Sequence, residues 1–146
     1  MIAFCDTNVL LDVLAKREPF YDDSARVWAL AETGRLRAQV SVLSFADIYY
    51  IVRRMRDREA AAESMRLLRD TFESVPFDAK ILGQAIDSDL RDFEDAIQFY
   101  SALRAGADCV VTRNPAHFPT EDLAIVTPAQ FLAVLAQSSL HPPAQD

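Results

Sequence analysis

Short apolar segments alternate along this sequence with longer segments whose apolar residues recur at helical spacing. The segments expected to be strands are residues 1–5, 38–43, 74–77, 108–112 and 123–126. Strands that run parallel must be joined by long crossovers, usually helices, and most intervals between these segments can hold at least one helix. The alternation therefore predicts an α/β domain with three layers, α/β/α, around a largely parallel central sheet.

Length and composition favour a single domain. The chain has 146 residues, and a hydrophobic content of 51% is enough for a core of ordinary size. We expect the domain to span residues 1–137 and to end with a helix that begins at Thr127-Pro128. Residues 138–146 contain Ser and Pro and are expected to form a flexible C-terminal tail.

The sequence also indicates where the protein works. No segment reaches the roughly 18 uninterrupted apolar residues of a membrane span, and Asp6 comes too early for an export signal. Cys5 and Cys109 both lie in expected strands, which favours buried free thiols in a reducing compartment over a disulfide. We therefore expect a cytoplasmic protein that does not bind membranes.

Composition excludes several kinds of binding site. A formal net charge of −7 argues against a protein that holds nucleic acid through a broad basic surface. Three scattered glycines are too few for the glycine-rich loops that cradle nucleotide phosphates. Two histidines and two cysteines cannot supply a Cys₄ or Cys₂His₂ zinc site with closing spacing. Any metal must therefore be held mostly by oxygen atoms.

Acidic and polar residues follow the expected strands, at the edge where parallel sheets bind ligands. Asp6 ends the first strand, and Asp47 lies shortly after the second. Asp92 and Asp95 are three residues apart at the start of a helix, so we expect their side chains to share one face and Glu94 to point away. Carboxylates from distant segments are thereby expected to converge.

Helix capping is the alternative explanation for most of these acids. Ser44 and Asp47 have the spacing of a capping box, and Asp92 could be an N-cap with Asp95 in the first turn. Asp6 does not fit this explanation as well, because a carboxylate at the end of a buried strand needs donors or a cation to offset its desolvation. Massed carboxylates favour a bound Mg²⁺ or Mn²⁺, which can promote phosphodiester hydrolysis by water.

Three stretches of the sequence resemble the PIN domain family, a metal-dependent ribonuclease fold that includes the VapC-like toxins of bacterial toxin–antitoxin pairs. They are Phe4-Cys5-Asp6-Thr7-Asn8-Val9-Leu10-Leu11-Asp12, Asp92-Phe93-Glu94-Asp95-Ala96-Ile97-Gln98 and Val110-Val111-Thr112-Arg113-Asn114. The resemblance extends from Met1 to about Leu135. It implies a ribonuclease that uses Mg²⁺ or Mn²⁺ to hydrolyse RNA phosphodiester bonds, as the toxin of a type II toxin–antitoxin pair.

The resemblance also implies a set of metal ligands. The first acidic ligand falls on Asp6, and the second, commonly Glu in the family, falls on the shorter Asp47. The third falls on Asp95, with Asp92 as an additional acid. Where the family often has a further Asp, this sequence has His117.

Other residues are assigned less direct roles. Asn114 could supply an amide oxygen in place of the missing acid, and His117 is either a donor or ligand at the site or a surface-loop residue. By the same resemblance, hydrogen bonds from a further group would position the carboxylates or waters. That group is Thr7, Asn8, Ser44 and Thr112.

Arginine is the expected contact with RNA, because thirteen of the fifteen basic residues are Arg. The first candidates are Arg54 and Arg58, taken to lie one helical turn apart, and Arg113 beside the acids. A solvated helical face with intrahelical ion pairs is the alternative for residues 53–69. The family resemblance further implies a homodimer and a small antitoxin partner, and residues 49–52 could lie in the core or in such an interface.

Two other functions remain open at this point. The departures at Asp47 and His117 could leave a catalytically weak PIN-like module that binds metal, RNA or protein. A phosphatase with Asp6 as nucleophile is a further alternative, but such enzymes usually have a second Asp two residues later, where this chain has Asn8.

Overall fold

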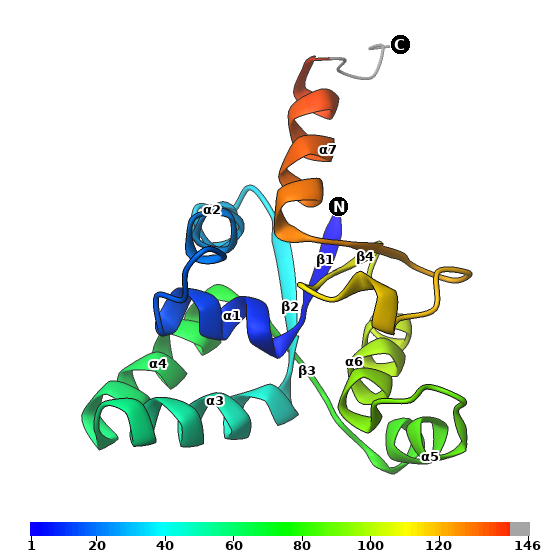
Figure 1. The fold of residues 1–146 in the computed structure, drawn as a ribbon, viewed down its shortest axis with the longest axis horizontal. Helices are drawn as coiled ribbons and strands as arrows, with labels where there is room; N and C mark the ends of the chain where they lie inside the picture. The colour runs from blue at the N-terminus through cyan, green and yellow to red at the C-terminus, as the bar shows by residue number, and fades with distance from the viewer. Residues whose placement is uncertain (141–146) are drawn as a thin grey trace.

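The computed structural model describes residues 1–140 and contains a five-stranded parallel sheet (Figure 1). The strands are β1 (Ile2–Cys5), β2 (Arg37–Ser41), β3 (Glu73–Val75), β4 (Cys109–Val111) and β5 (Ala124–Val126). Their spatial order is β3-β2-β1-β4-β5, so the first strand lies at the centre and the chain builds outward from it on both sides. The predicted parallel sheet is confirmed.

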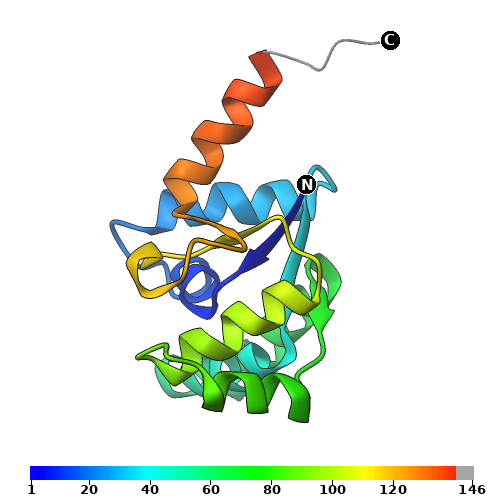
Figure 2. The ribbon, with the colours of Figure 1, turned by 90° about the vertical axis from the view of Figure 1, so that its right-hand side faces the viewer.

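Helices cover both faces of this sheet. They are α1 (Thr7–Leu14), α2 (Tyr21–Glu32), α3 (Val42–Met55), α4 (Arg58–Thr71), α5 (Ala79–Asp87), α6 (Phe93–Arg104), α7 (Pro128–Leu140) and the 3₁₀ turn η1 (Pro115–His117). Helices α1–α4 lie on one side and α5 and α6 on the other (Figure 1), while the end of α7 projects from the body (Figure 2). The predicted three-layer α/β/α architecture is confirmed.

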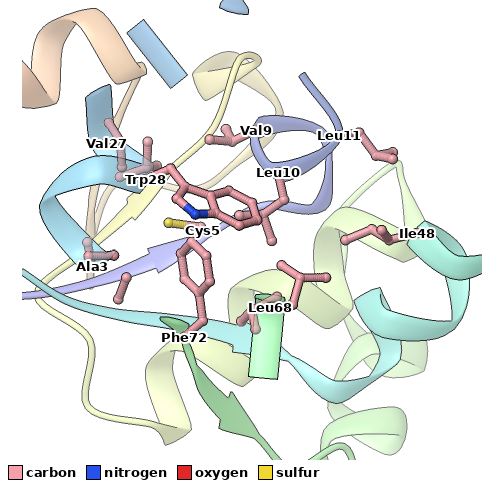
Figure 3. Packing of buried hydrophobic residues seen from close by; sticks show 14 of the residues in the cluster. Ala3, Cys5, Val9, Leu10, Leu11, Val27, Trp28, Ile48, Leu68 and Phe72 are labelled. Carbon is pink, nitrogen blue, oxygen red and sulfur yellow. The ribbon is translucent and has the colours of Figure 1, made fainter. Parts of the chain in front are cut away.

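Alternating side chains along the strands supply the two cores. Ala3 and Cys5 point into the cluster beneath α1–α4, whereas Phe4 points to the opposite face and packs in the cluster that includes Phe99 of α6. In the first cluster Cys5 lies beside Trp28 and Phe72 (Figure 3), whose rings meet edge to face at 4.9 Å. A central strand buried on both faces explains the continuous apolar run at the start of the chain.

Both cysteines are free and buried, as predicted. Burial raises the pKa of the Cys5 thiol to about 12, and the charges of Cys109 and Asp6 add to the effect. Burial likewise raises the pKa of Cys109 to about 11. Both thiols are therefore protonated at neutral pH and serve as small core residues.

The sequence predicts a helix from Ser44 to about Arg58, and α3 differs from this prediction at both ends. It begins at Val42, because Ser41 ends β2 and its Oγ accepts a hydrogen bond from the Leu43 N–H at 3.2 Å. The predicted cap, Ser44, lies fully buried inside the helix. The predicted capping box of Ser44 and Asp47 was therefore wrong.

The sequence predicts one helix through about Arg58 and another from Glu59 to Phe72; the structure has both helices but breaks the chain earlier, so that Arg58 begins α4. Helix α3 ends at Met55, and Arg56 has non-helical backbone angles of φ −128° and ψ −95°. Asp57 then caps α4 by accepting a hydrogen bond from the Ala60 N–H at 2.7 Å. Because Asp57 starts a new helix directly after the break, Arg54 lies at the end of α3 and Arg58 at the start of α4.

Helix α7 begins at the predicted place and ends later than predicted. Thr127 Oγ1 accepts from the Gln130 N–H at 3.1 Å, and Gln130 Oε1 accepts from the Thr127 N–H at 2.9 Å. The helix continues to Leu140, beyond the expected end at Gln137. The predicted tail thus starts inside α7, and its remainder, 141–146, lies outside the described residues. Within residues 1–140, every helix is too short or too polar to cross a bilayer.

Candidate active site

Asp6 is fixed at the carboxyl end of the two central strands. It directly follows β1, and its N–H donates to the Val111 carbonyl of β4 at 3.0 Å. Thr112, the residue after β4, donates from Oγ1 to Asp6 Oδ2 at 2.9 Å. The Asp6 side chain is 3% exposed. The two strands that diverge at the switch point of the sheet therefore hold this carboxylate jointly, at the place where α/β folds bind ligands.

The surroundings of Asp6 disfavour its ionised form. Burial raises its pKa to about 6, and the charge of Asp95 acts in the same direction. Hydrogen bonds from Thr112 and from the Thr7 N–H, together with the charge of Arg113, oppose the rise in pKa. A cation in front of the carboxylate would offset the desolvation and the repulsion at once.

The start of α6 supplies further carboxylates. Asp92 is the N-cap, and its Oδ1 accepts from the Asp95 N–H at 2.9 Å, so the capping explanation for Asp92 is correct. Asp95 is partly buried, and its pKa is raised first by burial and then by the charge of Asp92. His117 opposes that rise through a hydrogen bond and through its charge when protonated.

Glu94, which was expected to point away from the site, is exposed at the start of α6 and still responds to the charges of the other acids. Its pKa is raised by burial and then by the charges of Asp47, Asp6, Asp92 and Asp95, in that order. The prediction treated Asp92 and Asp95 as one helical face, but α6 begins only at Phe93 and Asp92 has extended backbone angles. The spacing between Asp92 and Asp95 therefore cannot tell which side of α6 faces the other acids, because Asp92 lies before the helix.

Asp47 lies on α3, one turn after the buried Ser44. It is half-buried, and burial raises its pKa. We call Asp6, Asp47, Glu94 and Asp95 the acidic cluster; they come from the end of β1, from α3 and from α6. Their oxygen donors suit a hard divalent cation. Within residues 1–140, however, no three His, Cys, Asp or Glu side chains already surround one point as metal ligands.

Thr7 and Ser44 form a buried polar contact with a residue that the sequence reading missed. Their hydroxyl oxygens are 2.7 Å apart, and Gln98 Nε2 donates to Ser44 Oγ at 3.2 Å and to Thr7 Oγ1 at 3.4 Å. The prediction had hydrogen bonds from the two hydroxyls positioning carboxylates or waters; the structure shows the hydroxyls paired with each other and with Gln98. Gln98 lies among apolar residues of α6, so its spacing predicted only a core position.

The residues after β4 organise the loop beside Asp6. Thr112 Oγ1, besides donating to Asp6, accepts from the Asn114 N–H at 3.2 Å. Asn114 then precedes the 3₁₀ turn, where it contributes this backbone donor. Asn8, in the first turn of α1, is half-buried. The hydroxyl of Thr112 thus couples the loop to the central carboxylate.

His117 reaches the acids. Its Nδ1 lies 3.2 Å from Asp95 Oδ2, and its side chain is 57% exposed. It is therefore more than the surface-loop residue that one reading of the sequence favoured. An open pocket of about 600 Å³ adjoins this contact. The lining includes Leu90, Asp92, His117 and Phe118.

Arg113 has a buried partner that was not predicted. Its Nε lies 2.9 Å from Oδ2 of Asp12, which is fully buried in α1. Its guanidinium also stacks over Phe20, 4.3 Å from the ring centroid. Burial raises the pKa of Asp12, and the charges of Arg113 and Arg17 oppose that rise. These contacts hold the loop after β4 against α1.

The other two arginines predicted to bind RNA lie elsewhere. Arg54 is exposed on α3, over the Tyr50 ring at 5.7 Å from its centroid, and lines a shallow pocket with Arg17 and Met55. Arg58 is exposed at the start of α4. Residues 49–52 are divided between environments: Val52 is buried, Tyr49 and Ile51 pack against the core, and Tyr50 is 61% exposed.

The sequence matches the model of a known family over most of its length. The sequence model of the PIN domain matches residues 3–116. The chain belongs to the PIN domain family. The match covers β1, β4 and the helices that carry the acidic cluster, so this PIN domain has its central strands and its acids within the shared region.

Characterised and solved relatives resemble this PIN domain over most of its length. Ribonuclease VapC1 of Aquifex aeolicus is 22% identical over 133 residues, which cover 88% of this chain and 91% of the relative. A toxin–antitoxin complex from Klebsiella pneumoniae contains a chain with a TM-score of 0.65 and 18% identity, over 86% of this chain and 97% of that one. VapC20 of Mycobacterium tuberculosis is a sarcin-ricin loop cleaving toxin. Its structure has a TM-score of 0.61 and 17% identity, over 74% of this chain and 86% of that chain.

Proposed function

We propose that this PIN domain is a divalent-metal-dependent ribonuclease that hydrolyses RNA phosphodiester bonds. The observation that carries the proposal is the buried carboxylate of Asp6, held by Thr112 between two strand ends and facing the charges of other acids. A similar protein is a ribonuclease, VapC1, and a similar fold occurs in a toxin that cleaves the sarcin-ricin loop. Both likenesses support RNA as the substrate.

The metal ligands that we propose are Asp6, Asp95 and Asp47, with Glu94 and Asp92 as further acids close by. A bound Mg²⁺ or Mn²⁺ would supply a more acidic water and neutralise charge that develops on the phosphate. Thr112 keeps Asp6 oriented through its hydroxyl, and the cap of α6 by Asp92 fixes the first turn that carries Asp95. Water is the proposed nucleophile.

RNA would approach the acidic cluster from the open pocket between the 88–92 loop and η1. Arg91 lines this pocket and offers a cation for a phosphate. Arg54 and Arg58 remain candidates for more distant phosphates as separate exposed arginines. Arg113 is a weaker candidate for substrate contact than predicted, because its Nε is committed to Asp12.

We also propose that the protein is the toxin of a toxin–antitoxin pair in the cytoplasm, with a small antitoxin as partner and a homodimer as its assembly. A similar fold in a toxin–antitoxin complex supports the pairing. Copurification of the protein with the product of an adjacent small gene would test it. Recovery of the chain alone from cells that express both genes would count against the pairing.

An alternative function has a specific observation in its favour. The acids of residues 1–140 are not already arranged as a metal site, and the second family ligand is the shorter Asp47. A weak PIN-like module that binds RNA or protein without cleaving it would fit these facts. Metal-dependent cleavage by the purified protein decides between the two functions.

Asp95→Asn tests the ribonuclease proposal directly. We expect it to lower Mn²⁺-dependent cleavage of a labelled RNA by about 100-fold or more, because it removes a ligand charge while keeping the side-chain shape. The parent protein should lose activity in EDTA and regain it with Mn²⁺. Asp70→Asn, at an exposed position on α4, is the matched control and should cleave like the parent. Equal cleavage by Asp95→Asn and the parent would refute the proposal.

His117→Asp should change which metal the protein prefers. We propose that His117, 3.2 Å from Asp95 Oδ2, contributes a nitrogen to the site where the family often has an acid. His117 Nδ1 and Asp95 Oδ2 would both be available to hold one divalent cation if the hydrogen bond between them were given up. Nitrogen favours Mn²⁺ over Mg²⁺, and we expect His117→Asp to shift relative affinity toward Mg²⁺ by about tenfold. Calorimetric titration with each metal measures the shift; an unchanged Mn²⁺ to Mg²⁺ affinity ratio would contradict it.

A further inference from the structure

Three buried polar side chains meet beneath the acidic cluster, one from each of three helices. Thr7 comes from α1, Ser44 from α3 and Gln98 from α6, and all are at most 3% exposed. The two hydroxyl oxygens are 2.7 Å apart, and the Gln98 amide nitrogen donates to both at 3.2 and 3.4 Å. We call this group the polar junction.

Each member of the polar junction is a near neighbour of a proposed metal ligand. Thr7 directly follows Asp6 in the chain. Ser44 precedes Asp47 by three residues on α3, and Gln98 follows Asp95 by three residues on α6. Residues three apart lie on adjoining parts of one helix face. The junction therefore joins the same three segments that supply the acidic cluster.

The hydrogen bonds of Gln98 satisfy only part of its side-chain amide. Its Oε1 is buried and has no hydrogen-bond partner among the described residues. An amide that is only half satisfied carries a desolvation penalty, whereas an apolar side chain of similar volume would fill the space without one. Because both hydrogen bonds that Gln98 donates go to residues next to proposed metal ligands, its position points to a role in the neighbouring site.

We propose that Gln98 is a positioning residue, which through Thr7 and Ser44 sets the distances between the carboxylates at the end of β1, on α3 and on α6. The proposal rests on the proposed function, since it concerns the same metal ligands. Like-charged groups push their helices apart, and a directional contact among those helices keeps the ligands within reach of one cation. Hydrogen bonds fix the distance between helices more tightly than apolar contacts do, because apolar surfaces can slide past one another at little cost.

Gln39 provides a matched control within the chain. It is also a buried glutamine, 5% exposed, with one donated hydrogen bond and an unpartnered Oε1. Its amide nitrogen donates to the Ala105 carbonyl, at the end of α6 opposite to Asp95. Replacing Gln39 therefore removes the same chemistry at a place remote from the acidic cluster.

The test compares Gln98→Met with Gln39→Met by two measurements on each protein: Mn²⁺ affinity by calorimetry, and urea unfolding in EDTA. We expect Gln98→Met to weaken Mn²⁺ binding by about tenfold to a hundredfold while its unfolding midpoint stays at or above that of the parent. Gln39→Met should bind Mn²⁺ within about twofold of the parent. Ser44→Ala should also weaken binding, and adding it to Gln98→Met should cause little further loss, because both act through one contact.

The outcomes separate the two proposals. A parent protein that does not bind Mn²⁺ would overturn the proposed function together with this inference. A parent that binds Mn²⁺ while Gln98→Met binds it equally well would overturn only the role of Gln98. If Gln98→Met and Gln39→Met lost the same Mn²⁺ affinity, and each loss matched a loss of stability, the weaker binding would have a structural cause. That result would also overturn the role of Gln98. If Gln98→Met does not fold, Ser44→Ala decides by the same two measurements.

Discussion

Asp6→Asn is expected to raise the free energy of unfolding of the metal-free protein by about 3 kcal/mol near neutral pH, and to abolish RNA cleavage. The pKa of Asp6 is raised from 3.8 to about 6 by burial and by the charge of Asp95. The ionised side chain therefore destabilises the folded state. Asparagine keeps an acceptor for the Thr112 hydroxyl but carries no charge.

The pH dependence of this gain has a definite sign. Above about pH 6 the folded protein holds an ionised Asp6, and the full difference between parent and variant is present. Between pH 6 and 4 the folded parent takes up a proton while the unfolded chain stays ionised, so the difference shrinks. Below about pH 4 both states are protonated and the difference disappears.

Urea unfolding in EDTA near pH 7.5, 5 and 4 measures the effect, with Asp70→Asn as the control for removal of an exposed carboxylate. The control should change stability by less than about 1 kcal/mol at every pH. A loss of stability in Asp6→Asn near pH 7.5 would show that the carboxylate is a structural partner of Thr112 rather than a strained ligand. Its RNA cleavage is measured with Mn²⁺ present.

Arg113→Ala is expected to destabilise the protein by roughly 3–5 kcal/mol. The change leaves the fully buried Asp12 without the guanidinium that lies 2.9 Å away, and it removes the stacking over Phe20. A buried carboxylate that loses its partner must be protonated or hydrated, and both weaken the fold. The free energy of unfolding from urea titration near neutral pH gives the size of the effect.

The double variant Asp12→Leu/Arg113→Met is the informative companion. Replacing both charges with apolar groups of similar size should recover most of the lost stability, because no unpaired charge remains in the core. Arg54→Ala removes an exposed arginine over Tyr50 and should cost less than about 1 kcal/mol. If Arg113→Ala kept the stability of the parent and lost only RNA affinity, Arg113 would be a substrate contact, as the sequence suggested.

The sheet and its central acid were predictable because their signals are local. The apolar run of β1 ends abruptly at Asp6, and β-branched residues mark β4 just before Thr112. Strands of a parallel sheet present their carboxyl ends at one edge, so the meeting of these two residues follows from topology. The N-caps at Asp78 and Asp92 were predictable for a similar reason, since a cap acts within three residues.

The remaining features depend on partners far away in the chain. Ser41 and Ser44 both could cap α3, and the length of β2, which is set by pairing with β1 and β3, decides for Ser41. Asp12 and Gln98 lie in apolar stretches of their helices. The local sequence does not predict that Asp12 pairs with Arg113 or that Gln98 contacts Thr7. Their roles become visible only when the helices are packed.

The central place of β1 also constrains the order of events during protein synthesis. The half-sheet β1-β2-β3 can pair once the chain has emerged from the ribosome as far as residue 75. The hydrogen bond to Asp6 cannot form until Thr112, 106 residues further along the chain, has been synthesised. A nascent chain therefore cannot complete the proposed metal site before the segment that holds Thr112 has emerged, and the proposed RNA cleavage should be delayed until then.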